Sequence, residues 1–180
     1  MKNHPLLAFV LGAWLAGSVL METVAAYNFA GFADLFERNP ALAQHAGFDV
    51  KDADAKKASL LWVHSAELNR VLFHYWNRTQ ILLGVLALLL ALHARARRLP
   101  VVLLGLGLAL VVAVYWGIEP RLEDLGRQLD FVSRTPPPPG LATFQQLHQV
   151  SVIADGVRLA LLTAATLILF SSRPKAARPT

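Results

Sequence analysis

Two rows of charged and polar residues recur at three- and four-residue spacing in this 180-residue chain, and these residues are the best suited to chemistry. The first row consists of His64, Glu67, Arg70, His74 and Arg78. The second row consists of His148, Ser151, Asp155 and Arg158. Such spacing places the members of each row on one face of a helix. Carboxylates, guanidinium groups and imidazoles on facing helices can pair with one another, bind a solute or ligate a metal.

A polar cluster is predicted from these rows. It comprises Glu22, Glu67, Arg70, His74, Arg78, Glu119, His148, Asp155 and Arg158. Three of its acids, Glu22, Glu67 and Asp155, can pair with its three arginines. Charges inside a membrane helix are costly unless they are paired or hydrated. The pattern therefore fits a buried ion-pair network, a small polar pocket that binds an anion, a metal or a small solute, or exposed groups that reach the membrane interface by snorkelling.

The histidines raise the question of a metal or a haem. His64, His74 and His148, with Glu67, have the ligand types that suit Zn, Cu or Ni, and His74 and His148 are candidate axial ligands of a haem. Against a haem, each of these two histidines lies at helical spacing from Arg or Asp rather than in a groove of small residues. The sequence requires no cofactor, and a hydrogen-bonded structural role for each histidine is the more common case.

Enzymatic chemistry has little support in the sequence. The chain contains no Cys, which excludes disulfides, thiolate metal sites and thiol catalysis. It has no Gly-flanked Ser nucleophile, no His-Glu-x-x-His motif and no phosphate-binding loop. We therefore expect a non-enzymatic protein.

Four apolar blocks must position these residues. Hydrophobic residues make up 55% of the chain and charged residues 16%, against roughly 45–50% and about 25% in an average soluble chain. The blocks run over residues 6–26, 71–92, 99–118 and 150–170, and each is long enough to cross a hydrocarbon core about 30 Å thick. The sequence predicts an all-α, polytopic membrane four-helix bundle that forms a single membrane domain over residues 1–180. A cleaved signal peptide is the alternative for the first block, but that block exceeds the usual 7–15 apolar residues.

The distribution of cations predicts the orientation. The link over residues 93–98 contains three Arg and no acid, and the tail after Phe170 contains Arg173, Lys175 and Arg178. Short cation-rich segments stay in the cytoplasm, so we expect both chain ends inside, with exterior connections over residues 27–70 and 119–149. The net charge of +5 is then a topology signal and predicts no nucleic-acid partner. The expected location is a cell membrane crossed several times, most simply a bacterial inner membrane.

The exterior connections are expected to contain short interfacial helices. Phe29, Phe32 and Phe36 recur at helical spacing, which indicates an interfacial helix or an extension of the first span. Residues 121–130 are typical of a short charged helix. Thr143 and Gln146 form a candidate capping box for the last helix. Aromatic residues near the span ends are expected to anchor the chain at the interface; they are Trp14, Trp62, Tyr75, Trp76, Tyr115 and Trp116.

The chain resembles a known family in four short motifs. They are Trp14-Leu15-Ala16-Gly17, the stretch Glu67-Leu68-Asn69-Arg70-Val71-Leu72-Phe73, Glu119-Pro120-Arg121, and Phe144-Gln145-Gln146-Leu147-His148. Together these motifs are similar to the family of small, largely uncharacterised four-span membrane proteins that includes the animal protein associated with platinum-drug resistance. The resemblance implies a four-helix bundle with an exterior polar cluster and brings no established activity. The exterior segment over residues 39–57 is longer than the family leads us to expect.

Three functional hypotheses follow from the sequence. The first is a bundle whose exterior polar cluster binds or passes a small solute or a metal ion. The second is a structural or assembly subunit of a larger membrane complex or homo-oligomer, in which the polar rows are interfaces. The third is a haem- or metal-binding redox subunit. The lipid bilayer is the one partner common to all three, and the hydrocarbon inner halves of the spans argue against a permeation path.

Overall fold

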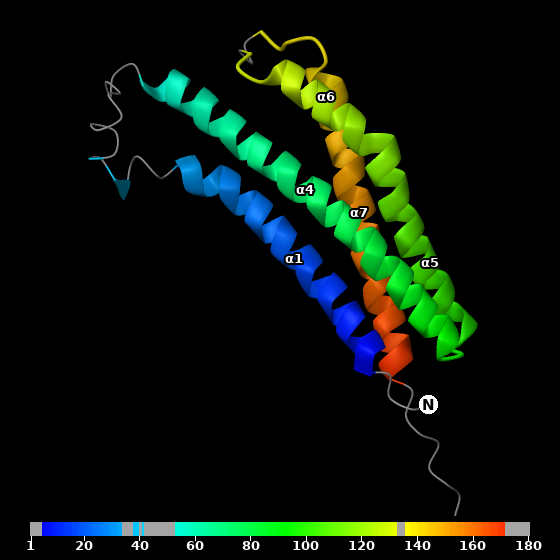
Figure 1. Ribbon diagram of the computed structural model, residues 1–180. Helices are drawn as coiled ribbons and strands as arrows, with labels where there is room; N and C mark the ends of the chain where they lie inside the picture. Colours follow the sequence, from blue (N-terminus) through cyan, green and yellow to red (C-terminus); the bar gives the residue numbers. More distant parts are fainter. Residues whose placement is uncertain (1–4, 34–37, 40, 42–52, 133–135, 172–180) are drawn as a thin grey trace, which may run out of the picture.

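The computed structural model is built of helices, and it describes residues 5–33, 38–39, 41, 53–132 and 136–171. The helices are α1 Pro5–Ala33, α4 Ala53–His93, α5 Arg98–Ala113, the π-helix η1 Val114–Ile118, α6 Glu119–Leu129 and α7 Leu141–Phe170. The described residues contain no strand. These helices form a bundle in which α5, η1 and α6 follow one another as a single rod (Figure 1).

Four helical segments are long and apolar enough to cross a membrane: Pro5–Ala30, Val63–His93, Arg98–Leu129 and Leu141–Phe170. The predicted all-α membrane four-helix bundle is therefore confirmed. Each of these segments is longer than its predicted span of 6–26, 71–92, 99–118 or 150–170.

The predicted short interfacial helices are in part extensions of the spans. α1 continues through Ala33, so Phe29 and Phe32 belong to it, while Phe36 lies outside the described residues. The predicted short charged helix over residues 121–130 is confirmed as α6, which has Pro120 in its first turn. It continues the third span directly, since Arg98–Leu129 forms one segment.

The start of α7 also differs from the prediction. The helix begins at Leu141, and its N-cap is Gly140 with φ 86°, without a side-chain capping bond. A capping box at Thr143 and Gln146 is therefore ruled out. Glycine adopts this left-handed conformation at little cost, and it allows the chain to turn sharply from the prolines into the helix.

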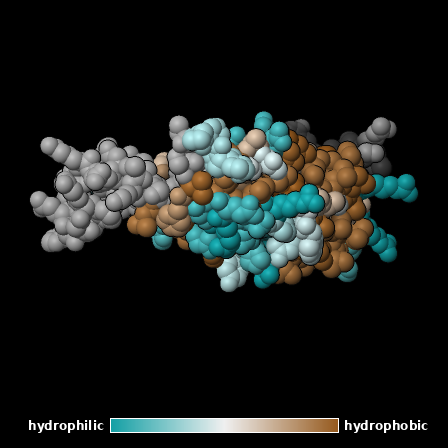
Figure 2. Space-filling model, turned by 90° about the horizontal axis from the view of Figure 1, so that it is seen from above, coloured by the Kyte–Doolittle hydropathy of each residue, from teal (hydrophilic) through white to brown (hydrophobic). Residues whose placement is uncertain are grey.

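The bundle places three features at one end. The beginning of α1, the turn between α4 and α5 and the end of α7 lie together there (Figure 1). At the opposite end lie α6 and the start of α7 (Figure 1). Seen from that opposite end, hydrophilic residues form a band across the molecule beside extensive hydrophobic surface (Figure 2). We call the end that carries α6 the polar end.

The hydrophobic core fills the half of the bundle away from the polar end. Its buried members include Leu7, Val10, Leu11, Trp14, Ala87, Ala91, Leu104, Leu162, Ala165 and Leu169. Large apolar side chains such as Phe9, Leu82 and Leu106 remain exposed on the outside of the helices. In a chain with four membrane spans, such side chains face lipid rather than water.

Tryptophans pack over glycines between α1 and α4. A Cβ atom on Gly84 would lie 2.7 Å from the Trp14 ring, and one on Gly17 would collide with the Trp76 ring. Trp14 is fully buried, so its predicted role as an interfacial anchor is wrong. Trp116 and Tyr75 are exposed, at 64% and 65%, as interfacial anchors would be.

Two helix pairs make up the bundle. α1 packs mainly against α4 and α5 against α7, and α4 also contacts α5. Contact between α1 and α7 is less extensive. The α1–α4 pair and the rod of α5, η1 and α6 with α7 splay apart toward the polar end (Figure 1).

Candidate ligand-binding cavity

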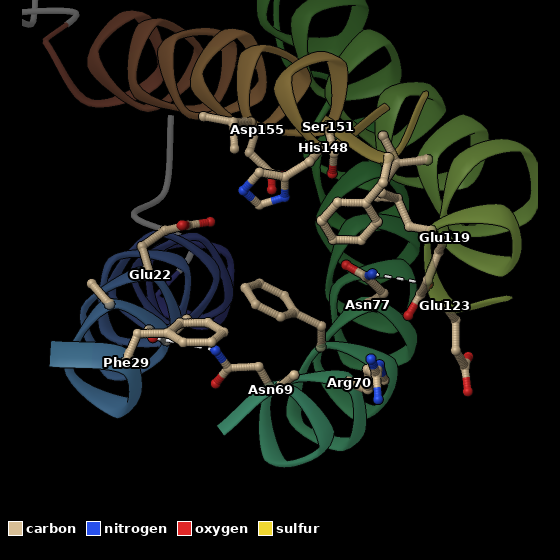
Figure 3. A pocket seen from close by; sticks show the side chains of 18 residues that line it. Glu22, Phe29, Asn69, Arg70, Asn77, Glu119, Glu123, His148, Ser151 and Asp155 are labelled. Carbon is tan, nitrogen blue, oxygen red and sulfur yellow. Dashed lines mark hydrogen bonds between the residues drawn. The ribbon is translucent and has the colours of Figure 1, made fainter. Parts of the chain in front are cut away.

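A cavity of about 390 Å³ lies between the splayed helix pairs. α1, α4, α6 and α7 line it, and η1 contributes Val114. Most of its lining is apolar and includes the rings of Phe29, Phe73 and Phe144. Figure 3 shows polar side chains from all four helices around the same space.

Acidic groups dominate the polar lining of the cavity. Its carboxylates belong to Glu22, Glu119, Glu123 and Asp155, and its basic or titratable nitrogen groups belong to Arg70 and His148. The His148 ring stacks on Phe144 with ring centroids 6.1 Å apart. The cavity therefore combines aromatic walls with an excess of carboxylates.

The wall between α4 and α6 is held by an ion-pair ladder. Arg70 donates two hydrogen bonds to Asp130, at 2.8 and 2.9 Å, and a third to Glu67 at 2.8 Å. Arg127 bridges Glu67 and Glu123 at 3.2 and 2.9 Å. Arg70 and Asp130 are mostly buried, so this bidentate pair is stronger than an exposed one.

The absence of a side chain at Gly126 makes room for Arg70 in this wall. A Cβ on Gly126 would lie 3.0 Å from Nη2 of Arg70 and 3.5 Å from the Phe144 ring. The close approach of α6 to α4 therefore depends on the absence of a side chain at position 126.

A chain of hydrogen bonds ends on the carboxylate of Glu119. Trp14 Nε1 donates to Gln80 Oε1 at 3.1 Å, Gln80 Nε2 to Asn77 Oδ1 at 3.0 Å, and Asn77 Nδ2 to Glu119 Oε2 at 3.0 Å. The last of these bonds is drawn in Figure 3. All three donors point the same way, so each bond polarises the next. The chain fixes a carboxylate at the cavity wall.

Amide groups close the wall between α1 and α4. Asn28 donates to Asn69 at 2.7 Å, Asn69 donates to the carbonyl oxygen of Ala25 at 3.2 Å, and Ser65 donates to the carbonyl oxygen of Asn28 at 2.8 Å. Asn69 and Ser65 are buried. These bonds hold the two helices together along the edge of the cavity.

Arg158 is a buried cation near the cavity's acids. It is 2% exposed, its Nη1 lies 3.0 Å from Asp155, and its Nη2 donates to Ser18 at 3.4 Å. Its Nε has no hydrogen-bond partner among the described residues. Glu22 makes no ion pair within the described part of the chain, although the charges of Asp155 and Arg158 act on it. Asp155 is therefore the carboxylate that compensates Arg158 directly.

The structure separates the predicted cluster into three groups. Glu22, Arg70, Glu119, His148 and Asp155 line the cavity. Glu67 and Arg158 pair with lining residues. The remaining two, His74 and Arg78, lie outside the lining beside Tyr115, whose hydroxyl accepts a 2.9 Å bond from Arg78. Among the residues that the structure describes, Arg78 forms none of the ion pairs that the sequence allowed for it.

The predicted metal and haem ligands are not brought together. His148 lines the cavity, His74 lies against Tyr75 and Tyr115, and His64 is exposed. Within the described ranges no group of three or more His, Cys, Asp or Glu side chains is arranged to hold a metal ion. Neither a metal site at His64, His74 and His148 nor a haem between two of them gains support.

Several residues of the site were missed from the sequence. They are Asn28, Asn69, Asn77, Gln80, Glu123 and Asp130. Asn69, Asn77 and Gln80 lie on one face of α4, which was an available signal. No local signal showed that Asp130, at the end of α6, would reach Arg70.

The fold and the cavity define an integral membrane four-helix bundle with an acidic, aromatic cavity toward its polar end. No family model matches the chain, and neither curated proteins nor solved structures show a significant match to it.

Proposed function

We propose that this protein is a non-enzymatic membrane protein that binds a small organic cation in the cavity. The observation that carries the proposal is the charge balance of the site. Its carboxylates are Glu22, Glu67, Glu119, Glu123, Asp130 and Asp155, and its buried or paired guanidinium groups are Arg70, Arg127 and Arg158. With every group counted as ionised, six acids against three arginines leave a formal excess of three negative charges. Counting Arg78, which lies near Glu119, still leaves two.

The arginines of the site are already engaged. Arg70 is bound by Asp130 and Glu67, and Arg158 by Asp155. They are poor candidates for binding an anionic ligand, because an anion would have to displace these carboxylates. Within the described residues, the one hydrogen bond that Glu119 accepts comes from the Asn77 amide, and Glu22 has no ion pair. These two carboxylates are the ones available to a cation.

The apolar lining favours an organic cation over a hydrated metal ion. The rings of Phe29, Phe73 and Phe144 line the same cavity, and aromatic faces attract ammonium groups, quaternary ones included. The volume of about 390 Å³ lies within the range of roughly 300–1,000 Å³ that is usual for small-molecule sites. A substituted ammonium ion satisfies both the charge and the apolar walls.

The proposal places the cavity toward the exterior side of a cell membrane, such as a bacterial inner membrane. The arginines at residues 95, 97 and 98 support this orientation, because they lie in the turn at the end opposite α6. We also propose that the chain is related to the family of small four-span membrane proteins that includes the animal protein associated with platinum-drug resistance. The packed apolar core below the cavity favours binding over passage.

A matched pair of probes tests cation binding. Choline and its neutral isostere 3,3-dimethylbutan-1-ol differ in charge but hardly in shape, and calorimetry on the protein in lipid nanodiscs compares them. We expect choline to bind and the neutral isostere to bind at least tenfold more weakly. Glu119→Gln should weaken choline binding at least tenfold. The control Asp124→Asn should have no effect, because Asp124 is exposed on the same helix and bonds Gln128 outside the cavity.

Two results would contradict the proposal: equal affinity for the charged and neutral probes, or equal effects of Glu119→Gln and Asp124→Asn. The mass of the same preparation tests the alternative function as an assembly subunit. Copurification of a second membrane protein in fixed ratio, with no choline binding, would favour that alternative.

A further inference from the structure

The exposed residues of the cavity lining all come from two helices. On α1 they are Glu22 and Ala26, and on α7 they are His148 and Val152. Every lining residue from α4, η1 and α6 is buried or half-buried. The cavity therefore reaches the molecular surface along the edge between α1 and α7.

Each of the other edges of the cavity is closed by side chains. Asn28 and Asn69 join α1 to α4, and Arg70 and Asp130 join α4 to α6. Between α6 and α7, a Cβ on Gly126 would lie 3.5 Å from the Phe144 ring.

Polar contacts join α1 to α7 on only one side of the cavity, the side away from the polar end. The hydrogen bond of 3.4 Å between Arg158 and Ser18 joins these helices. From Ser18 to the polar end, no hydrogen bond or ion pair joins α1 to α7 among the described residues. Among the described residues, opening this edge on the side of Ser18 toward the polar end breaks no polar contact.

Carboxylates flank this opening. Glu22 from α1 and Asp155 from α7 lie on opposite sides of it (Figure 3). Two like charges disfavour closure of the edge, whereas a cation between them stabilises both.

Apolar surface surrounds the same opening. Val19 on α1 is 58% exposed, and Val152 and Ile153 on α7 are 53% and 57% exposed. All three lie within segments long and apolar enough to span a membrane. These exposed apolar side chains at the opening are suited to contact with lipid.

We propose that the α1–α7 edge is a lateral portal through which the cavity takes the head of a cationic amphiphile from the membrane, while its alkyl chain stays in the lipid. This inference rests on the proposed cation-binding function and adds the ligand class and its route. The charged head would lie between Glu22, Asp155 and Glu119, and the alkyl chain would pass Val152 into the bilayer.

A covalent bridge between α1 and α7 across the portal tests whether the ligand enters by this route. The chain has no Cys, so Ala26→Cys with Val152→Cys gives one pair for a bis-maleimide linker, with bridging checked by mass. The same variant capped with N-ethylmaleimide carries two adducts and no bridge, and it is the matched control. Stopped-flow binding in nanodiscs compares dodecyltrimethylammonium with choline.

Relative to the capped control, we expect the bridge to slow association of the dodecyl cation at least tenfold more than that of choline, because the linker lies where the alkyl chain would pass. Equal rates with and without the bridge, or equal slowing of both cations, would overturn the portal. If unmodified protein binds neither cation, the proposed function itself fails, so the two failures are distinguishable.

A second measurement needs no variant. In unmodified protein, the association rate of the dodecyl cation should follow its concentration in the membrane, which anionic lipid raises at constant aqueous concentration. A rate that follows the aqueous concentration alone would contradict access from the bilayer.

Discussion

Arg158 shows how a single charge is accommodated inside the bundle. Its guanidinium is almost fully buried, its only ionic partner among the described residues lies 3.0 Å away, and its Nε is unsatisfied. Removing one member of a buried ion pair lowers stability more than replacing both members by apolar residues, because the remaining charge is left uncompensated. The Asp155–Arg158 pair is therefore the most vulnerable polar contact in the fold.

Asp155→Asn should lower the free energy of unfolding by about 3 kcal/mol, the lower end of the range for a broken buried pair, because Asp155 keeps some exposure. Unfolding in mixed micelles measures the loss. Asp155→Ala combined with Arg158→Leu should recover part of it. Glu22→Gln is the control and should leave stability nearly unchanged, since Glu22 has no ion pair in the described chain. Equal losses for the two single variants would contradict this account.

Among the individual residues of the site, the sequence predicted the charged ones better than the neutral ones. Asp155 and Arg158 were found because two charges three residues apart inside an apolar span must pair or be hydrated. Asn77 and Gln80 were missed because a lone amide costs less in a membrane and gives no charge balance to check. The partner of Arg70 was also missed, because Asp130 lies 60 residues away in sequence.

The π-helix η1 sets the direction in which α6 faces. It lies between α5 and α6, its Val114 is buried at the cavity, and Glu119 follows it directly. A π-turn behaves as one extra residue in an α-helix, and one residue corresponds to a rotation of about 100°. In a regular α-helix over the same residues, Glu119 would turn by about that angle, so the wider π-turn keeps Glu119 facing the cavity.

Deletion of Gly117 should convert η1 to α-helix and retain choline binding. Gly117 is exposed, and a Cβ there would meet nothing within 4 Å, so its loss removes no packing contact. The deletion takes out the one extra residue that the π-turn absorbs, so Glu119 keeps its direction toward Asn77. Calorimetry measures choline binding and circular dichroism the fold of the same sample, and Gly117→Ala is the control that keeps the π-turn. Loss of binding in the folded deletion variant would contradict this account of the π-turn.

The pairing of α1 with α4 depends on where glycines lie. Gly84 must stay small, because an added Cβ would lie 2.7 Å from the Trp14 ring and 2.8 Å from Leu108. Gly84→Ala should therefore destabilise the protein by roughly 1–3 kcal/mol, as overpacking does. Gly12→Ala is the matched control: nothing lies within 4 Å of its Cβ, so it should be neutral or gain up to about 1 kcal/mol from helix propensity. Mixed-micelle unfolding compares the two, and equal effects would contradict the packing argument.

For the whole molecule, hydropathy predicted the four spans but not their ends. The number and order of the helices follow from four apolar blocks, which the lipid environment requires to be helical. The extension of α1 was one of the two alternatives that the spacing of Phe29, Phe32 and Phe36 offered. The start of α4 at Ala53 and the continuity of α6 with α5 were not predicted. The added segments of α4 and α6 are polar, so a search for hydrocarbon-length blocks stops before them. The cavity between the splayed pairs depends on tertiary packing that periodicity does not encode.

Reporter fusions can test the orientation of the chain in the membrane. A reporter active only in the cytoplasm should work when fused after Arg178 or inside residues 93–98, and should be silent inside residues 49–57, because the cations of the first two segments are retained inside. A periplasm-active reporter at the same positions should give the opposite pattern. A cytoplasmic signal from residues 49–57 would contradict the orientation and place the cavity on the inner side.

The packed core that includes Leu11, Leu104 and Leu162 has an electrical consequence. It acts as an insulator below the cavity, so nearly the whole membrane potential falls across it. In the orientation proposed above, a bound cation then stays close to the potential of the outer solution, although carrying one charge across 100 mV would be worth roughly 2.3 kcal/mol. The fraction of cavities that hold a cation should therefore not depend on the membrane voltage, and the protein should not conduct ions across the membrane.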